Sequence, residues 1–189
     1  MNPDTLIGGF QSPPTDSARA FRACLTALSR PGQISTISGA LPPAPLSVAA
    51  GTLALTLLDG TTPVHLAGDL DCAALRDWLT FHTGAPIVGA AEAAFAFGTW
   101  EALQPIGRFA IGTAEYPDRA ATLVIECMAL AAQGARLSGP GIKDHARLNL
   151  PETAAFRANR ALFPLGFDAF LTAGDQIAGL PRSTIVEDI

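Results

Sequence analysis

The chain has 189 residues, 49% of them hydrophobic and 15% charged, and its formal net charge at pH 7 is −5. This size and composition allow a buried core and fit one folded domain over residues 1–189, which excludes a disordered chain. The negative charge argues against a nucleic-acid partner, because phosphate neutralisation needs a basic surface.

The first predicted elements are an extended arm and an amphipathic helix. Residues 1–14 are expected to form the arm, and Thr15 or Asp16 can cap the helix that follows. Pro31 and Gly32 end this helix. Apolar residues recur at intervals of three and four and lie on one helical face, namely Ala18, Phe21, Leu25 and Leu28.

Helices and strands alternate along the rest of the chain. Further helices are predicted at 47–58, 71–81 and 151–160, and strands at 33–37, 63–67, 86–88, 94–97, 121–129, 169–173 and 176–180. A strand followed by a glycine turn is predicted at 134–142. The continuous apolar run at 121–129 is typical of a central strand covered on both faces. Gly174 and Asp175 suit a type II′ hairpin turn between the last two strands. We therefore predict an α/β fold, a mixed sheet with helices on both faces.

Neither a membrane segment nor a secreted protein is expected. No apolar run reaches the ~18–20 residues that a spanning helix needs, and the first residues lack the pattern of a signal peptide. Cys24, Cys72 and Cys127 are odd in number and widely spaced, which indicates free thiols in a reducing cytoplasm. Because paired Cys or His at short spacing are also missing from the sequence, we expect no metal site.

Several residues could contact an anion or a partner. Gly139 and Gly141 suit either a tight turn or an anion cradle, and His82 suits either the end of a helix or a catalytic role. Arg182, with Ser183 and Thr184 beside it, could grip phosphate, dock a partner or pair with Glu187.

Glu126 interrupts the apolar run at 121–129. A carboxylate in such a strand must be paired, protonated or at an edge. An arginine partner is the structural interpretation, and a general base is the functional one. No Ser or Cys lies in a nucleophile-elbow context, so no catalytic residue is assigned.

The order of several short segments resembles that of one bacterial family, the H subunit of the carbon–phosphorus lyase core complex (the PhnH family). These segments are 21–22, 27–32, 62–64, 81–86, 112–114, 121–126, 137–142, 163–168 and 180–184. The resemblance extends from Phe21 to Glu187. Phe167, Ser183 and Lys143 depart from the family pattern, which lowers the interest of Lys143 as a functional group.

The resemblance implies a fold similar to the large domain of pyridoxal-phosphate-dependent transferases, without use of that cofactor. It also implies a homodimer that joins G, I and J subunits. That assembly replaces the adenine of ATP by methylphosphonate, which gives α-D-ribose 1-methylphosphonate 5-triphosphate. The family supplies no catalytic residue to carry over.

Three hypotheses follow about function. The first is an accessory subunit with no activity alone, and the second is a stand-alone pyridoxal-phosphate enzyme. The third is a protein that binds nucleotide or phosphonate and delivers it to partners. The second needs a Schiff-base lysine, and Lys143 is the only lysine in the chain.

Overall fold

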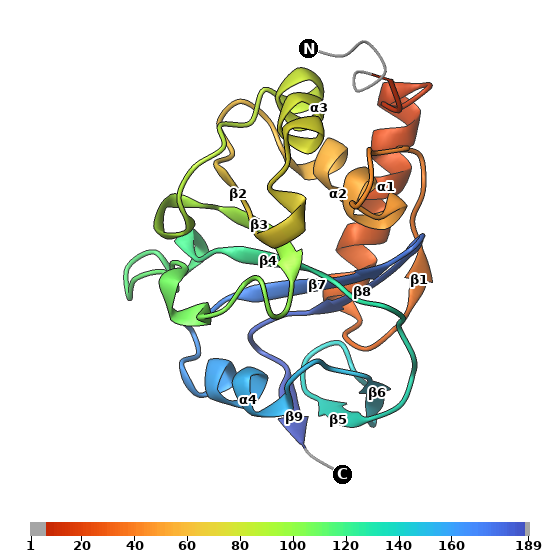
Figure 1. The fold of residues 1–189 in the computed structure, drawn as a ribbon. Helices are drawn as coiled ribbons and strands as arrows, with labels where there is room; N and C mark the ends of the chain where they lie inside the picture. Colours follow the sequence, from red (N-terminus) through yellow and green to blue (C-terminus); the bar gives the residue numbers. More distant parts are fainter. Residues whose placement is uncertain (1–6, 188–189) are drawn as a thin grey trace.

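The computed structural model describes residues 7–187 and is organised around a six-stranded mixed sheet (Figure 1). The strand order is β1-β8-β7-β4-β3-β2, in which β2, β3, β4 and β7 run parallel and β8 and β1 are antiparallel to their neighbours. The strands are β1 (Ser35–Thr36), β2 (Val64–Leu66), β3 (Phe95–Thr99), β4 (Thr122–Glu126), β7 (Asp168–Ala173) and β8 (Gln176–Leu180). The predicted mixed α/β architecture is confirmed.

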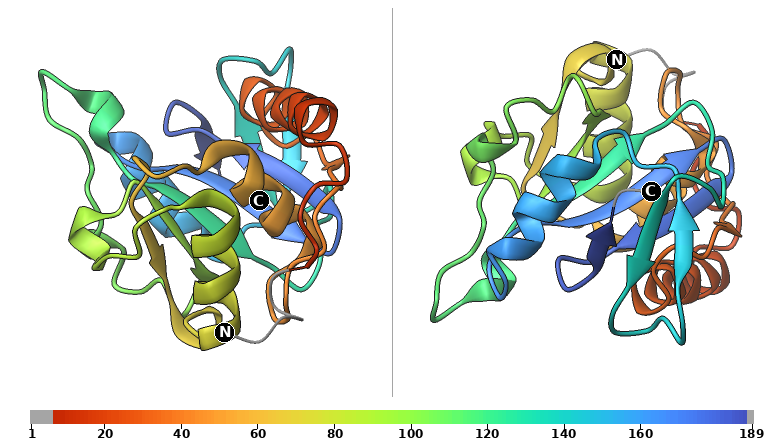
Figure 2. Two further views of the ribbon diagram at one scale, coloured as in Figure 1. Left: turned by 90° about the horizontal axis from the view of Figure 1, so that it is seen from above. Right: turned by 90° about the horizontal axis from the view of Figure 1, so that it is seen from below.

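Different elements cover the two faces of this sheet (Figure 2). Three helices lie on one face: α1 (Pro13–Ser29), α2 (Val48–Leu57) and α3 (Ala73–Thr83). The other face is covered by α4 (Thr153–Ala161) and by a three-stranded sheet of β6 (Ala146–Leu148), β5 (Ala135–Ser138) and β9 (Ile185–Glu187). This second sheet was not predicted as a separate unit.

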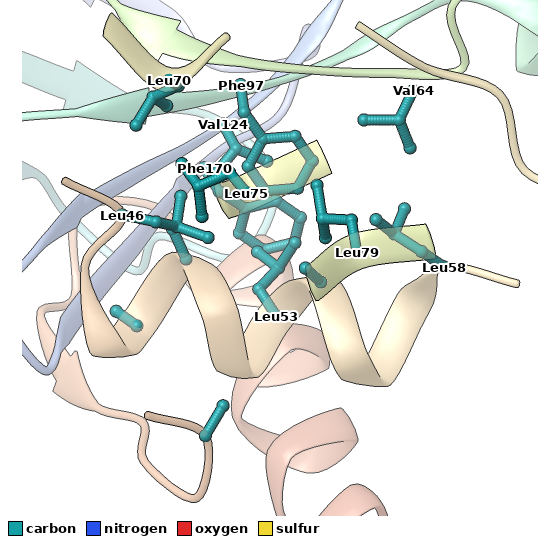
Figure 3. Packing of buried hydrophobic residues seen from close by; sticks show 14 of the residues in the cluster. Leu46, Leu53, Leu58, Val64, Leu70, Leu75, Leu79, Phe97, Val124 and Phe170 are labelled. Atoms are coloured by element: carbon teal, nitrogen blue, oxygen red, sulfur yellow. The ribbon is translucent and has the colours of Figure 1, made fainter. Parts of the chain in front are cut away.

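The central strands are apolar throughout because both of their faces are buried. Val124 packs with the helices α2 and α3, as Figure 3 shows together with Leu53 and Leu75. Its neighbours Leu123 and Ile125 point the other way and join the core under α4. The continuous apolar pattern therefore predicted the environment of β4 correctly.

Helix α1 lies so close to β8 that small residues form the contact. The residues that it buries are Ala20, Cys24 and Ala27. A Cβ atom on Gly179 of β8 would lie only 2.4 Å from the Ala27 carbonyl oxygen. The predicted apolar face is largely exposed instead, with Phe21 51% and Leu25 57% accessible.

Several predicted boundaries are wrong by a few residues. The first helix begins at Pro13, not after residue 14, because proline is tolerated in a first turn that needs no N–H. The Ser12 N–H donates to Asp16 Oδ2 at 2.8 Å and closes this turn. Residues 1–6 of the predicted arm lie outside the described residues.

Other corrections concern strand ends. Strand β4 ends at Glu126 instead of residue 129, and the predicted strand 86–88 is only an isolated bridge at Ile87. Strand β5 ends at Ser138, and Gly139 and Gly141 follow it with positive φ, in agreement with the predicted strand and glycine turn. The predicted helix 151–160 begins at Thr153. The apolar patterns continue past the ends of β4 and β5 because Cys127, Leu130 and Ile142 of the following loops pack against the core, while Met128 is exposed.

The predicted hairpin and the cysteine state are confirmed. Gly174 has a φ of +59° between β7 and β8, as the first central residue of a type II′ turn requires. Cys24, Cys72 and Cys127 are free thiols. Within residues 7–187, no helix has both the length and the apolar character needed to cross a membrane.

Candidate functional site

An open cleft lies where the carboxyl ends of β3, β4 and β7 meet. Its volume is about 730 Å³, and Thr99, Glu126 and Gly174 mark the strand ends that form it. A second cavity of about 440 Å³ continues toward the end of β2 and shares Glu126 with the first. Ligands of open α/β sheets bind at this edge, so the cleft is the candidate site.

Glu126 forms part of the floor of the cleft. Its Oε1 accepts a hydrogen bond from the Ser47 backbone N–H at 2.8 Å, and its Oε2 accepts one from the Thr172 hydroxyl at 3.1 Å. Thr172 is fully buried and is the register partner of Glu126 on β7. Burial raises the pKa of Glu126, while these hydrogen bonds oppose the rise. The expected arginine partner is wrong, and the partners are a backbone amide and a hydroxyl.

The amino end of α2 faces the same carboxylate. Ser47 is the N-cap, and its Oγ accepts from the Ala50 N–H at 3.1 Å. The Ala49 N–H donates to the Gly174 carbonyl at 2.9 Å. A helix amino end attracts anions, but here the chain's own oxygens already accept from the N–H groups of Ser47, Ala49 and Ala50. Glu126 thus accepts a hydrogen bond that an external anion could otherwise accept at this helix end.

Cys127 follows Glu126 in the wall of the cleft. Burial raises the pKa of its thiol to about 11, and the neighbouring carboxylates of Glu126 and Glu101 add to the rise. Since the thiolate is the nucleophilic form, Cys127 is poorly suited to covalent catalysis near neutral pH. Among residues 7–187, no group of three or more His, Cys, Asp or Glu side chains is arranged to hold a metal ion.

Arg182 lies at the amino ends of the parallel strands, opposite the cleft, and contacts Asp168, the first residue of β7. Its Nε and Nη2 donate to the two carboxylate oxygens of Asp168 at 3.1 and 2.6 Å, and its Nη1 donates to the Pro117 carbonyl at 2.6 Å. The Arg182 side chain is 12% exposed. The alternative of a pair with Glu187 is wrong, because Glu187 pairs with Arg136 at 2.6 Å. Arg182 pairs with Asp168 instead and ties the loop at Pro117 to the sheet.

Similarity to known proteins extends over nearly the whole chain. The family model described as bacterial phosphonate metabolism protein (PhnH) matches residues 8–187. The chain belongs to the PhnH family. It is 42% identical over 189 residues, 95% of this chain and 94% of the relative, to the alpha-D-ribose 1-methylphosphonate 5-triphosphate synthase subunit PhnH of Rhizobium meliloti (strain 1021). It is 32% identical over 171 residues, 87% of this chain and 83% of the relative, to the putative C-P lyase subunit protein HtxG of Stutzerimonas stutzeri.

In this PhnH-family chain, three more predicted site residues gather beside the second sheet. Strands β5 and β9 pair with Ser138 opposite Ile185, which brings Gly139 next to Ser183 and Thr184. Thr184 is buried and its hydroxyl lacks a hydrogen-bond partner within the described part of the chain. These residues do not line the cleft.

Gly141 packs against the end of α1. Its φ is +83°, and a Cβ atom there would lie 2.0 Å from the Ser29 carbonyl oxygen. Only glycine combines this conformation with such a close approach. The tight-turn alternative describes the observed geometry of this segment.

His82 lies in the last turn of α3, before Gly84, the left-handed C-cap. Its ring is 5.1 Å from the Trp78 ring and 4.9 Å from the Phe81 ring, measured between centroids. A Cβ on Gly9 would lie 2.6 Å from the His82 ring. The histidine is thus packed between α3 and the amino-terminal segment, away from the cleft.

Lys143 is exposed in the connection between β5 and β6 and does not line the cleft. A Schiff base with pyridoxal phosphate requires a lysine amine in an enclosed pocket. The residues that line the cleft at the carboxyl edge include no lysine.

Sequence reasoning singled out Glu126 but missed its partners Ser47 and Thr172, because ordinary cap and strand patterns do not distinguish these two residues from others.

Proposed function

We propose that this chain is an accessory subunit of an α-D-ribose 1-methylphosphonate 5-triphosphate synthase in phosphonate breakdown. The observation that carries the proposal is the close similarity to the Rhizobium meliloti synthase subunit over nearly the full length of both chains. The family model and the Stutzerimonas relative support the same pathway.

The chemistry of the cleft favours an accessory role over catalysis. Replacement of the adenine of ATP by methylphosphonate needs the two anions positioned together, with cations to compensate their charge. The charged residues that line the two adjoining cavities are Glu101, Glu126 and Asp69. Among the described residues, no Lys, Arg or His lines either cavity, so the chain by itself is poorly equipped for that reaction.

The finer proposals concern the assembly. The chain acts in the cytoplasm as one domain, its sheet is that of the large domain of pyridoxal-phosphate-dependent transferases, and it joins G, I and J subunits. A mostly parallel sheet with the antiparallel strand β8 supports the likeness in fold. The exposed position of Lys143 argues against the stand-alone enzyme, and the acidic cleft argues against the delivery of anions.

The exposed face of α1 supports the proposal of a symmetric homodimer. Ala18, Phe21 and Leu25 form an apolar stripe on this helix, and large apolar side chains gathered on a surface often mark an interface. Phe21→Asp combined with Leu25→Asp should give a monomer in sedimentation velocity. The matched variant Leu162→Asp, which alters an exposed leucine after α4, should leave the dimer intact.

Adenine release tests the proposed function directly. The purified chain is incubated with ATP and methylphosphonate, alone, with the partner subunits, and with one subunit omitted at a time. We expect adenine only from the complete set. Turnover by the isolated chain would contradict the accessory role, and full activity of the partners without it would make the chain dispensable.

A further inference from the structure

The cleft at the carboxyl edge is mainly apolar and carries negative charge at its mouth. Pro45, Leu150 and Pro151 contribute apolar lining, and Glu101 is an exposed carboxylate beside them. The amino end of α2 offers little to an external anion, because Glu126 and the Gly174 carbonyl already accept from its N–H groups. A cation complements such a surface better than an anion does.

The rim of the cleft carries one side chain that is completely exposed. Met128 has a relative exposure of 103% and lies two residues past the end of β4, in the lining of the cleft. A flexible, polarizable thioether held in water beside a cleft is typical of surfaces that adapt to a protein partner. The cavity volume of about 730 Å³ exceeds what one small cation would fill.

We propose that this cleft docks a segment of a partner subunit that presents an arginine or lysine side chain flanked by apolar residues. The cationic group lies against Glu101, and the apolar residues pack on Met128 and Pro45. The inference rests on the proposed function, since it requires an assembly. It goes beyond membership of a complex, because it specifies the chemistry of the partner segment.

The test compares two charge reversals at opposite ends of the same strand. Glu101 follows the end of β3 in the cleft, while Glu92 precedes the start of β3 at the other edge, and both are exposed. Glu101→Lys and Glu92→Lys therefore change net charge equally without touching the core. Binding of each variant to the purified assembly of partner subunits is measured by biolayer interferometry.

We expect Glu101→Lys to weaken binding at least about tenfold, because two cations then meet at the mouth of the cleft. Met128→Lys should weaken it in the same direction, and Glu92→Lys should stay within about twofold of the wild type. Circular dichroism of each variant verifies folding.

The outcomes separate the docking inference from the proposed function. If the wild type binds and Glu101→Lys binds equally well, docking at the cleft is wrong while the accessory role stands. Equal losses for Glu101→Lys and Glu92→Lys would show an effect of overall charge and overturn the inference. Failure of the wild type to bind would refute the proposed function, and the docking with it. Displacement of the partner assembly by free arginine amide at submillimolar concentration would reassign the cleft to a small cation.

Discussion

Replacement of Arg182 by alanine should destabilise the fold rather than remove a ligand contact. The guanidinium group makes three side-chain hydrogen bonds, two to Asp168 and one to the Pro117 carbonyl. Arg182→Ala removes all three and leaves the carboxylate of Asp168 without its cation. The Asp168 side chain is 26% exposed, so water only partly replaces the lost partner.

The magnitude follows from this burial. Breaking a fully buried ion pair costs about 3–5 kcal/mol. Asp168 keeps the backbone N–H of residue 182 as a donor at 2.8 Å, and it keeps some contact with water. We therefore expect the free energy of unfolding to fall by about 2–3 kcal/mol, which lowers the Tm of a chain of this length by roughly 4–12 °C.

Urea denaturation followed by circular dichroism measures this change. Arg136→Ala is the matched control, because Arg136 also pairs with a carboxylate, that of Glu187, at 2.6 Å. Both of these side chains are nearly half exposed, so the loss should stay below about 1 kcal/mol. An unchanged stability of Arg182→Ala would refute the reasoning and would leave the guanidinium available for an anion.

Three further predictions use other parts of the structure. Gly179→Ala should lower the free energy of unfolding by about 1–3 kcal/mol in urea denaturation, because the added Cβ meets the Ala27 carbonyl. Glu126→Gln should gain stability relative to the wild type as the pH rises. Burial raises the pKa of Glu126 in the folded state and so favours its neutral form. The stability that this neutral form contributes is complete below the unfolded-state pKa and is lost as the pH rises through the folded-state pKa. Cys127, whose thiol pKa is raised from 9.0 to about 11, should react with iodoacetamide near pH 7.5 roughly 100-fold more slowly than an exposed cysteine, measured by mass spectrometry of peptides.

The first of these predictions has a control variant, and each of the other two has an outcome that would contradict it. Gly89→Ala should be nearly neutral, since nothing lies within 4 Å of a Cβ there. A stability of Glu126→Gln that stays constant or falls relative to the wild type from about pH 4 to about pH 8 would contradict the raised pKa. Alkylation of Cys127 in the folded protein at the rate seen in urea would show that its burial is wrong.

The sequence by itself determined the elements whose signal is local. The apolar segment predicted as a helix at 47–58 matches α2 to within one residue at each end, and Gly174 predicted a hairpin turn at the correct place. The unbroken apolar run around Val124 predicted a central strand. These features depend on residues a few positions apart, so their pattern survives without knowledge of the fold. The order of short segments was sufficient to indicate the family.

Only the tertiary structure decided which side chains meet. Glu126 finds its partners Ser47 and Thr172 at separations of 79 and 46 residues, through the strand order of the sheet. Arg182 could have bound an anion, but its position after the end of β8 places it against Asp168, with which it pairs. Periodicity likewise gave α1 an apolar face at Phe21 without showing that the small residues of another face would pack on β8. A side chain's partner depends on strand order and on crossovers, and no local pattern of residues encodes these.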